Sequence, residues 1–155
     1  LPCRPVFHDL PAAPFELPGV HVTAELVCHP GPTLGYRIED GGSSLTYIPD
    51  HEPALGADLE RLEEDWISGF ELARDASLLI HDGQYSDEEY PNHIGWGHST
   101  WQQGCRVADA AGVGRAVIFH HEPNHDDTVM DGIAAAAAEM RPGTLVAFEG
   151  MVLEL

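Results

Sequence analysis

Residues 77–83 read Ser-Leu-Leu-Ile-His-Asp-Gly, a short apolar run that ends in an imidazole and a carboxylate. An apolar run of this length, closed by a turn residue, is typical of a buried strand. Residues 115–123, Arg-Ala-Val-Ile-Phe-His-His-Glu-Pro, repeat the arrangement. The sequence therefore predicts buried strands whose carboxyl ends present His, Asp and Glu side chains at one edge of a sheet.

The rest of the chain supplies further strands and helices around these two runs. Alternating or short apolar segments predict strands at 20–28, 34–39, 44–48, 144–148 and 151–155, and helical spacing predicts helices at 57–73, 99–111 and 126–140. Ser99 and Gln102 have the spacing of a capping box for the second helix. Strands that first follow one another and then alternate with helices predict the α/β class with a mixed sheet.

The composition restricts the class of protein. The 155 residues include seven Arg and no Lys against 26 acidic residues, a formal net charge of −19, and 43% of the residues are hydrophobic. One globular domain is expected, and the negative field argues against nucleic acid as a partner and for a small-molecule substrate. Three Cys without a C-x-x-C pair fit a reducing, cytoplasmic location, and no membrane span or signal segment is expected.

Ten His outnumber all the Arg, and several lie in four clusters that follow predicted strands or open loops. The clusters are residues 28–31 (Cys-His-Pro-Gly), 81–83 (His-Asp-Gly), 97–100 (Gly-His-Ser-Thr) and 120–123 (His-His-Glu-Pro). Imidazole and carboxylate together are the ligands that first-row metals prefer, and a carboxylate can bridge two such ions. If the clusters meet at one edge of the sheet, the sequence predicts a metal site there.

The ordered set of these clusters, with Tyr-Ile-Pro-Asp at 47–50 between the first two, resembles the later part of the metallo-β-lactamase fold. It is similar in particular to the phosphodiesterase branch that includes ribonuclease Z. The resemblance covers residues 20–155 and implies an αββα sandwich, of which this chain supplies the C-terminal part, a mixed sheet flanked by helices. Residues 1–19, rich in Pro, are expected to be an extended connecting segment.

The resemblance also implies roles for individual residues. His29 and His120 match metal ligands, Asp82 matches the carboxylate that bridges two metals, and His98 matches the catalytic His that contacts the scissile phosphate or protonates the leaving group. Asp50 matches an Asp that orients the site. The implied cofactor is a divalent metal, Zn²⁺ as one or two ions, with Mn or Fe as alternatives.

Three other histidines leave alternatives open. His121 becomes the ligand in place of His120 if the register slips by one residue. Strand alternation points His81 away from Asp82, toward a supporting or core role. His125, next to Asp126 and Asp127, fits a cluster at the start of a helix.

One departure from the family pattern limits the functional interpretation. The family's principal ligand string, His-x-His-x-Asp-His, does not occur in this sequence. We therefore expect that the N-terminal portion of the domain is missing, disordered or a separate chain, and that this chain pairs with it or with a second copy. The expected function is a metal-dependent hydrolase of a phosphodiester or similar small ester. The alternative is an incomplete or degenerate module with a binding or assembly role and no catalysis by itself.

Overall fold

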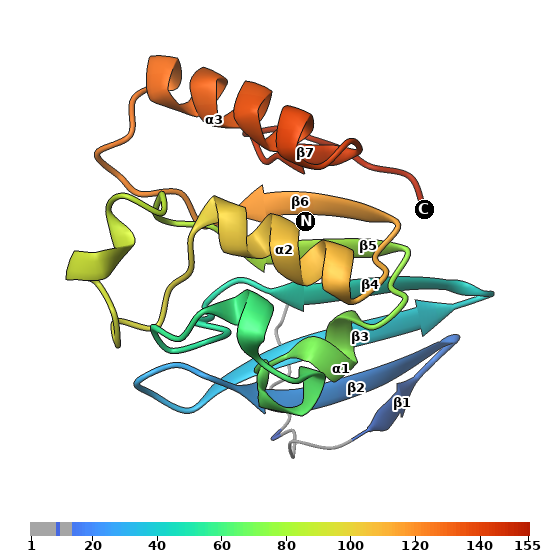
Figure 1. The fold of residues 1–155 in the computed structure, drawn as a ribbon. Coiled ribbons are helices and arrows are strands. Elements are labelled where there is room, and N and C mark those ends of the chain that lie inside the picture. Colours follow the sequence, from blue (N-terminus) through green and yellow to red (C-terminus); the bar gives the residue numbers. More distant parts are fainter. Residues whose placement is uncertain (1–8, 10–13) are drawn as a thin grey trace.

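The computed structural model describes Asp9 and residues 14–155, and within them a single seven-stranded sheet organises the chain (Figure 1). The strands lie side by side in chain order from β1 to β7. They are β1 (Phe15–Leu17), β2 (Val20–Val27), β3 (Thr33–Asp40), β4 (Ser43–Ile48), β5 (Leu78–Asp82), β6 (Arg115–Phe119) and β7 (Thr144–Val146).

The strand directions decide where polar side chains gather. Strands β1 to β4 pair antiparallel, whereas β4, β5, β6 and β7 are parallel to one another. Two antiparallel pairings separate β2 from β4, so β2 also runs parallel to β4. The carboxyl ends of β2, β4, β5 and β6 therefore share one edge of the sheet.

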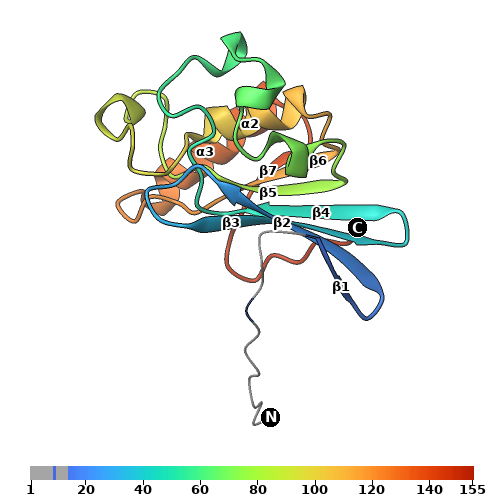
Figure 2. The same cartoon turned by 90° about the horizontal axis from the view of Figure 1, so that it is seen from below.

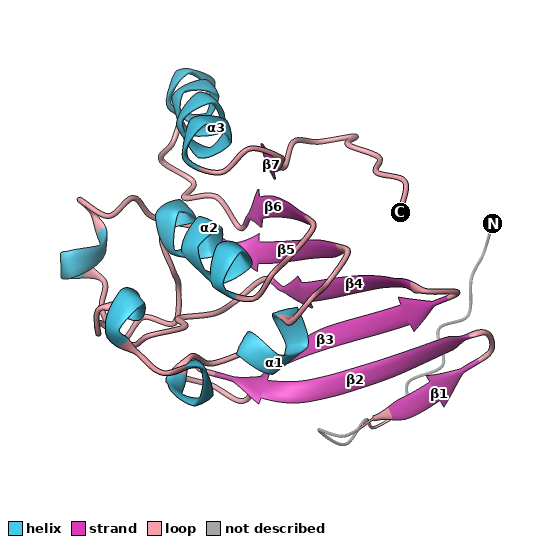
Figure 3. Ribbon diagram, turned by 45° about the vertical axis from the view of Figure 1, so that its right-hand side comes forward, coloured by secondary structure: helices cyan, strands magenta, loops and turns pink. Residues whose placement is uncertain are grey.

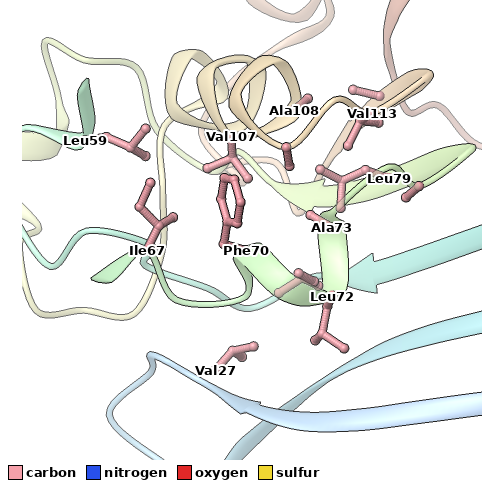
Figure 4. Packing of buried hydrophobic residues seen from close by; sticks show 14 of the residues in the cluster. Val27, Leu59, Ile67, Phe70, Leu72, Ala73, Leu79, Val107, Ala108 and Val113 are labelled. Atoms are coloured by element: carbon pink, nitrogen blue, oxygen red, sulfur yellow. The ribbon is translucent and has the colours of Figure 1, made fainter. Parts of the chain in front are cut away.

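One face of the sheet carries the helices (Figures 1 and 3). They are α1 (Phe70–Ala73), α2 (Trp101–Ala110) and α3 (Asp127–Met140). The largest buried cluster lies between this face and α1 and α2 (Figure 4), with Phe70, Leu72, Leu79 and Val107 nearly inaccessible to solvent. Burial of a side chain of this size stabilises the fold by about 1.5–3 kcal/mol.

The opposite face of the sheet meets no helix of the described chain, and the C-terminal segment crosses below it (Figure 2). An apolar groove runs there between the strands and this segment, lined among others by Tyr47, Ile80, Phe119, Phe148 and Leu153. Within the described residues, no helix combines the length and apolar character needed to cross a bilayer.

The α/β class with a mixed sheet is confirmed, and the six strands expected between residues 20 and 148 are present with small shifts of their ends. The segment expected to be an extended connection contributes β1, while residues 1–8 and 10–13 of it lie outside the described part. The strand expected at 151–155 is absent, because this segment pairs with no neighbouring strand and instead borders the groove.

The long helix expected at 57–73 is wrong. The chain forms two 3-10 turns, Leu59–Arg61 and Glu64–Trp66, before the four-residue α1. Ser68 donates its N–H to Pro53 and accepts the N–H of Cys28 on its hydroxyl, so its hydrogen bonds go to distant loops. Gly69 follows with φ of +73°, which a helix interior does not permit.

The cap of α2 is shifted by one residue. Thr100, rather than Ser99, accepts the N–H of Gln103, whose side chain accepts the N–H of Thr100 in return. Ser99 is free for another task because of this shift, and both its N–H and its hydroxyl donate to Asp82.

Candidate metal centre

The shared edge of the sheet brings four of the sequence clusters together. His29 follows β2, Asp50 follows β4, Asp82 ends β5 and His120 follows β6. His98 reaches the same place from the loop before α2. Among the described residues, two overlapping groups have ligand atoms within 4.8 Å of one another, namely His29, Asp50 and His98, and Asp82, His98 and His120. The edge therefore offers the imidazole and carboxylate atoms that the sequence predicted for a metal.

Asp82 is fully buried, and both its carboxylate oxygens accept hydrogen bonds. Oδ1 accepts the N–H groups of Gln84 (3.1 Å) and Ser99 (3.0 Å). Oδ2 accepts the N–H of His51 (3.2 Å) and lies 2.7 Å from Nδ1 of His98. These donors satisfy a buried carboxylate and leave little room for a further ligand bond.

His98 is oriented by this carboxylate. Since an ionised carboxylate only accepts, Nδ1 of His98 donates to Asp82, and Nε2 is left for another partner. The hydrogen bond to Asp82 raises the pKa of His98, against the opposing effect of burial, and the charges of Asp82 and Asp50 raise it further. The pair therefore holds an imidazole ring that readily carries a proton, in one orientation.

Asp50 and His120 form a second pair at the same edge. Nε2 of His120 lies 3.0 Å from Oδ1 of Asp50, and the His120 ring stacks on that of His98 with 4.7 Å between the centroids. Asp50 is more than a third exposed. His120 has φ of +58°, an uncommon conformation for a residue with a side chain, and His121 points elsewhere, with Nε2 2.9 Å from the carbonyl of Ala147. The register favours His120 over His121 as the residue at the site.

His29 completes the group. Its ring lies edge-on to that of His98, with 5.6 Å between centroids. Nδ1 of His29 is 3.0 Å from the hydroxyl of Thr33, which itself donates to the carbonyl of Gly31, and 3.2 Å from the Gly31 N–H. The Gly31 N–H donates to Nδ1, so Nδ1 is occupied within its own loop and Nε2 is the ring nitrogen left to bind a metal, which it would do without its proton.

One buried histidine of the site, His51, was missed by the sequence reasoning. His51 and His81 are both fully buried, with His51 Nδ1 3.0 Å from His81 Nε2, and His81 Nδ1 donates to the carbonyl of Asp82 (2.6 Å). Burial lowers the pKa of both, so both rings are neutral at pH 7. His81 has the supporting place that alternation suggested, whereas nothing in the sequence marked His51 or its neighbour Glu52.

His125 also differs from its expected setting. Asp126 caps α3 by accepting the N–H of Val129, whereas His125 turns to Glu89, with 2.9 Å between Nε2 and Oε1. His125 therefore ties the start of α3 to the loop before α2.

A mixed sheet with helices on one face and a His and Asp cluster at its strand ends defines an α/β protein with a candidate metal site at the sheet edge. The chain belongs to the β-lactamase superfamily, because the family profile described as "Beta-lactamase superfamily domain" matches residues 6–121. The expected metallo-β-lactamase fold is thereby confirmed.

Sequence relatives of this chain are ribonucleases Z, in keeping with the expected likeness to that branch. It is 36% identical over 83 residues to a ribonuclease Z of Myxococcus xanthus, a match that covers 54% of this chain and 27% of the relative. It is 31% identical over 110 residues to that of Brevibacillus brevis, covering 68% and 31%. The chain thus matches about a quarter to a third of the length of these relatives.

Solved structures share the fold at low identity. The metallo-β-lactamase fold protein YhfI from Bacillus subtilis superposes with a TM-score of 0.71 at 19% identity, covering 94% of this chain and 54% of that protein. The short form of human tRNase Z gives 0.64 at 20% identity, covering 90% and 45%. Zn²⁺-bound PqqB from Methylobacterium extorquens gives 0.68 at 22% identity, covering 93% and 54%.

These relatives correct one expectation. The expectation that nucleic acid is unlikely as a partner is wrong, because the sequence relatives of this chain are ribonucleases. A formal net charge adds up every residue of the chain, whereas the approach of a polyanion depends on the local field and on bound cations. The charge of −19 therefore does not exclude an RNA substrate.

Proposed function

We propose that this chain supplies part of the active site of a metal-dependent phosphodiester hydrolase. The observation that carries the proposal is the convergence of His29, Asp50, His98 and His120, from four separate segments, on one edge of the sheet. Membership of the β-lactamase superfamily and the ribonuclease Z relatives support the same reaction class.

We assign the ion to Asp50 with the two imidazoles of His29 and His120, because Asp50 shares one group of possible ligand atoms with His29 and lies 3.0 Å from Nε2 of His120; Zn²⁺ is the first choice, with Mn or Fe as alternatives. The sequence had favoured Asp82 as the carboxylate ligand, with Asp50 orienting the site. The hydrogen bonds support the reverse division, because the oxygens of Asp82 are occupied by donors, whereas Asp50 is partly exposed and lies near the ligand atoms of His29, His98 and His120. The donor set fits a divalent metal of this kind.

When bound, the metal supplies an activated water and stabilises negative charge on the reacting phosphate. The residues of this chain then do two things. Asp82 holds His98 by Nδ1, and the raised pKa of His98 favours a proton on Nε2. His98 thereby donates that proton to the leaving oxygen as a general acid.

Three ligands from this chain leave a two-metal site incomplete. The string His-x-His-x-Asp-His, which the resemblance implies for the remaining ligands, is not in the sequence. We propose that a further polypeptide segment supplies those ligands and covers the apolar groove on the open face of the sheet. The proposed substrate class is a phosphodiester, which includes both small-molecule phosphodiesters and RNA.

The test measures metal and activity on the same preparations. Bound zinc per chain is determined by elemental analysis, and hydrolysis of bis(p-nitrophenyl) phosphate is followed for the wild type and for Asp50→Asn, His120→Ala and His98→Ala. We expect the first two variants to lose zinc and His98→Ala to keep zinc while losing hydrolysis. A wild-type chain that binds no zinc, alone or with the complementing segment, would refute the proposal.

A further inference from the structure

We propose that Glu52 is a positioning residue of this metal centre. Its buried carboxylate fixes the loop that carries His98 against the strand ends that carry His29 and Asp50. The inference rests on the proposed function, because the metal centre is part of that proposal. The hydrogen bonds and contacts that support it are made by the residues of this chain.

The carboxylate of Glu52 is fully buried and accepts hydrogen bonds on both oxygens. Oε1 accepts the hydroxyl of Tyr90 (2.6 Å) and the N–H of Gly95 (2.9 Å). Oε2 accepts the N–H of Gly95 (3.0 Å) and the N–H of Gly97 (2.9 Å). Burial and Glu52 both raise the pKa of Tyr90, so the phenol keeps its proton and remains a donor. Glu52 is therefore held by loop donors, which it fixes in return.

The backbone of Glu52 is tied to a third segment. Its N–H donates to the carbonyl of Cys28, 3.0 Å away, and Cys28 directly precedes His29. Glu52 itself lies two residues after Asp50, and its carboxylate binds Gly97, the residue before His98. One residue thus bonds to the immediate chain neighbours of two site histidines and shares the turn of Asp50.

Gly97 shows why the position of this loop matters to the metal. Its φ is +93°, and a Cβ at this position would lie 2.3 Å from Cδ2 and 2.9 Å from Nε2 of His29. The loop backbone therefore packs directly against the His29 ring, on the side of the nitrogen assigned to the metal. A shift of Gly97 by a few tenths of an ångström changes the space for that ring and the starting point of His98.

A glutamine at position 52 has nearly the same shape but a different set of hydrogen bonds. Its amide nitrogen only donates and would face the N–H of Gly97 or the donors on Oε1. At least one buried donor then loses its acceptor, and the loop moves to recover one. Glu52→Gln is therefore the variant that tests positioning without removing volume.

The experiment combines Co²⁺ binding with NMR on the chain. Co²⁺ affinity and visible absorption report the ligand arrangement. In metal-free protein, hydrogen exchange of the Gly95 and Gly97 amides and the Nδ1–H signal of His98 report the loop. Glu89→Gln is the matched control, because Glu89 accepts from Ser86 in the same loop region and pairs with His125 away from the His29 ring.

We expect Glu52→Gln to weaken Co²⁺ binding about 10- to 100-fold, to change the absorption spectrum, and to lose amide protection and the His98 signal. Glu89→Gln should keep the wild-type Co²⁺ affinity, absorption spectrum, amide protection and His98 signal. A folded Glu52→Gln variant with wild-type affinity, spectrum and His98 signal would overturn the inference.

Two further outcomes are also decisive. If the wild type binds no Co²⁺, the proposed metal centre fails, and the NMR comparison alone decides on Glu52: loss of the His98 signal supports positioning and its retention overturns it. If Glu52→Gln does not fold, Gly97→Ala tests the same contact with Glu52 in place. Its added Cβ should weaken Co²⁺ binding at least as much, and unchanged affinity and spectrum would overturn the inference.

Discussion

The variant Asp82→Asn distinguishes the role of Asp82 from that of Asp50. It changes one carboxylate oxygen of Asp82 to NH₂ with almost no change in volume. The amide oxygen can keep the Ser99 and Gln84 N–H groups that bind Oδ1. The NH₂ group then faces the N–H of His51 and Nδ1 of His98. His98 can adapt by moving its proton to Nε2 and accepting, whereas the His51 N–H cannot.

One buried donor is therefore left without an acceptor, and we expect the free energy of unfolding to fall by about 1–3 kcal/mol. Urea unfolding of the metal-free protein measures this value. Asp58→Asn serves as the control, because Asn keeps the side-chain acceptor that caps the 3-10 turn and the site is exposed, so a change within about 0.5 kcal/mol is expected.

Metal binding and catalysis should respond differently. Because Asp82 only orients His98 in this assignment, Asp82→Asn should keep Zn²⁺ binding within about tenfold, whereas Asp50→Asn should lose it. Phosphodiester hydrolysis by the complemented enzyme should fall about 10²- to 10⁴-fold, since His98 loses the carboxylate that raises its pKa, and a neutral imidazole ring is a poor general acid. Loss of Zn²⁺ in Asp82→Asn together with its retention in Asp50→Asn would refute the reasoning and make Asp82 the ligand.

Three further predictions concern stability. Leu79→Ala, at a fully buried position in the main cluster, should lower the free energy of unfolding by about 2–5 kcal/mol in urea titrations, and a loss below 1 kcal/mol would contradict the packing. Thr100→Ala should cost about 1 kcal/mol by the same measurement, because it removes the capping box of α2, and Thr100→Ser should restore most of it. Stability of the metal-free protein should fall as the pH decreases below 6.5, because burial lowers the pKa values of His51 and His81 in the folded state and the unfolded chain takes up those protons first, whereas the contribution of His98, whose pKa is raised, is fully present below 6.5 and is lost only as the pH rises; a pH-independent stability between pH 6.5 and 5 would contradict this.

The strands could be predicted because each carries its own pattern. Residues 20–27 alternate, and residues 78–80 and 116–118 are uninterrupted apolar runs between turns, so local periodicity and burial agree. Residues 57–73 also show a helical pattern, but Ser68 in their middle makes its hydrogen bonds to Pro53 and Cys28, outside the segment. Such tertiary partners cannot be read from periodicity.

The sequence predicted where the candidate site lies, but not which of its residues has which role. Parallel strands bring their carboxyl ends together, so polar clusters after apolar runs were enough to predict that His29, Asp82 and His120 lie at one edge of the sheet. The choice between Asp50 and Asp82 depends on donors from Ser99, 17 residues from Asp82 in the chain. The role of Glu52 depends on Gly97, 45 residues away.

The acidic composition takes on a different meaning once the site is known. Three acidic residues lie together at the strand ends, namely Asp50, Glu52 and Asp82. Each adds to the net negative charge from which repulsion of phosphate was expected. The same carboxylates attract divalent cations, and a bound ion is the largest local charge in such a site. With a metal in place, the field that a phosphodiester meets at this edge is set by the ion and by His98, whose pKa the neighbouring acids raise. The acids thus favour loading of the metal and protonation of the general acid, which are the two conditions that the proposed hydrolysis of an anionic substrate requires.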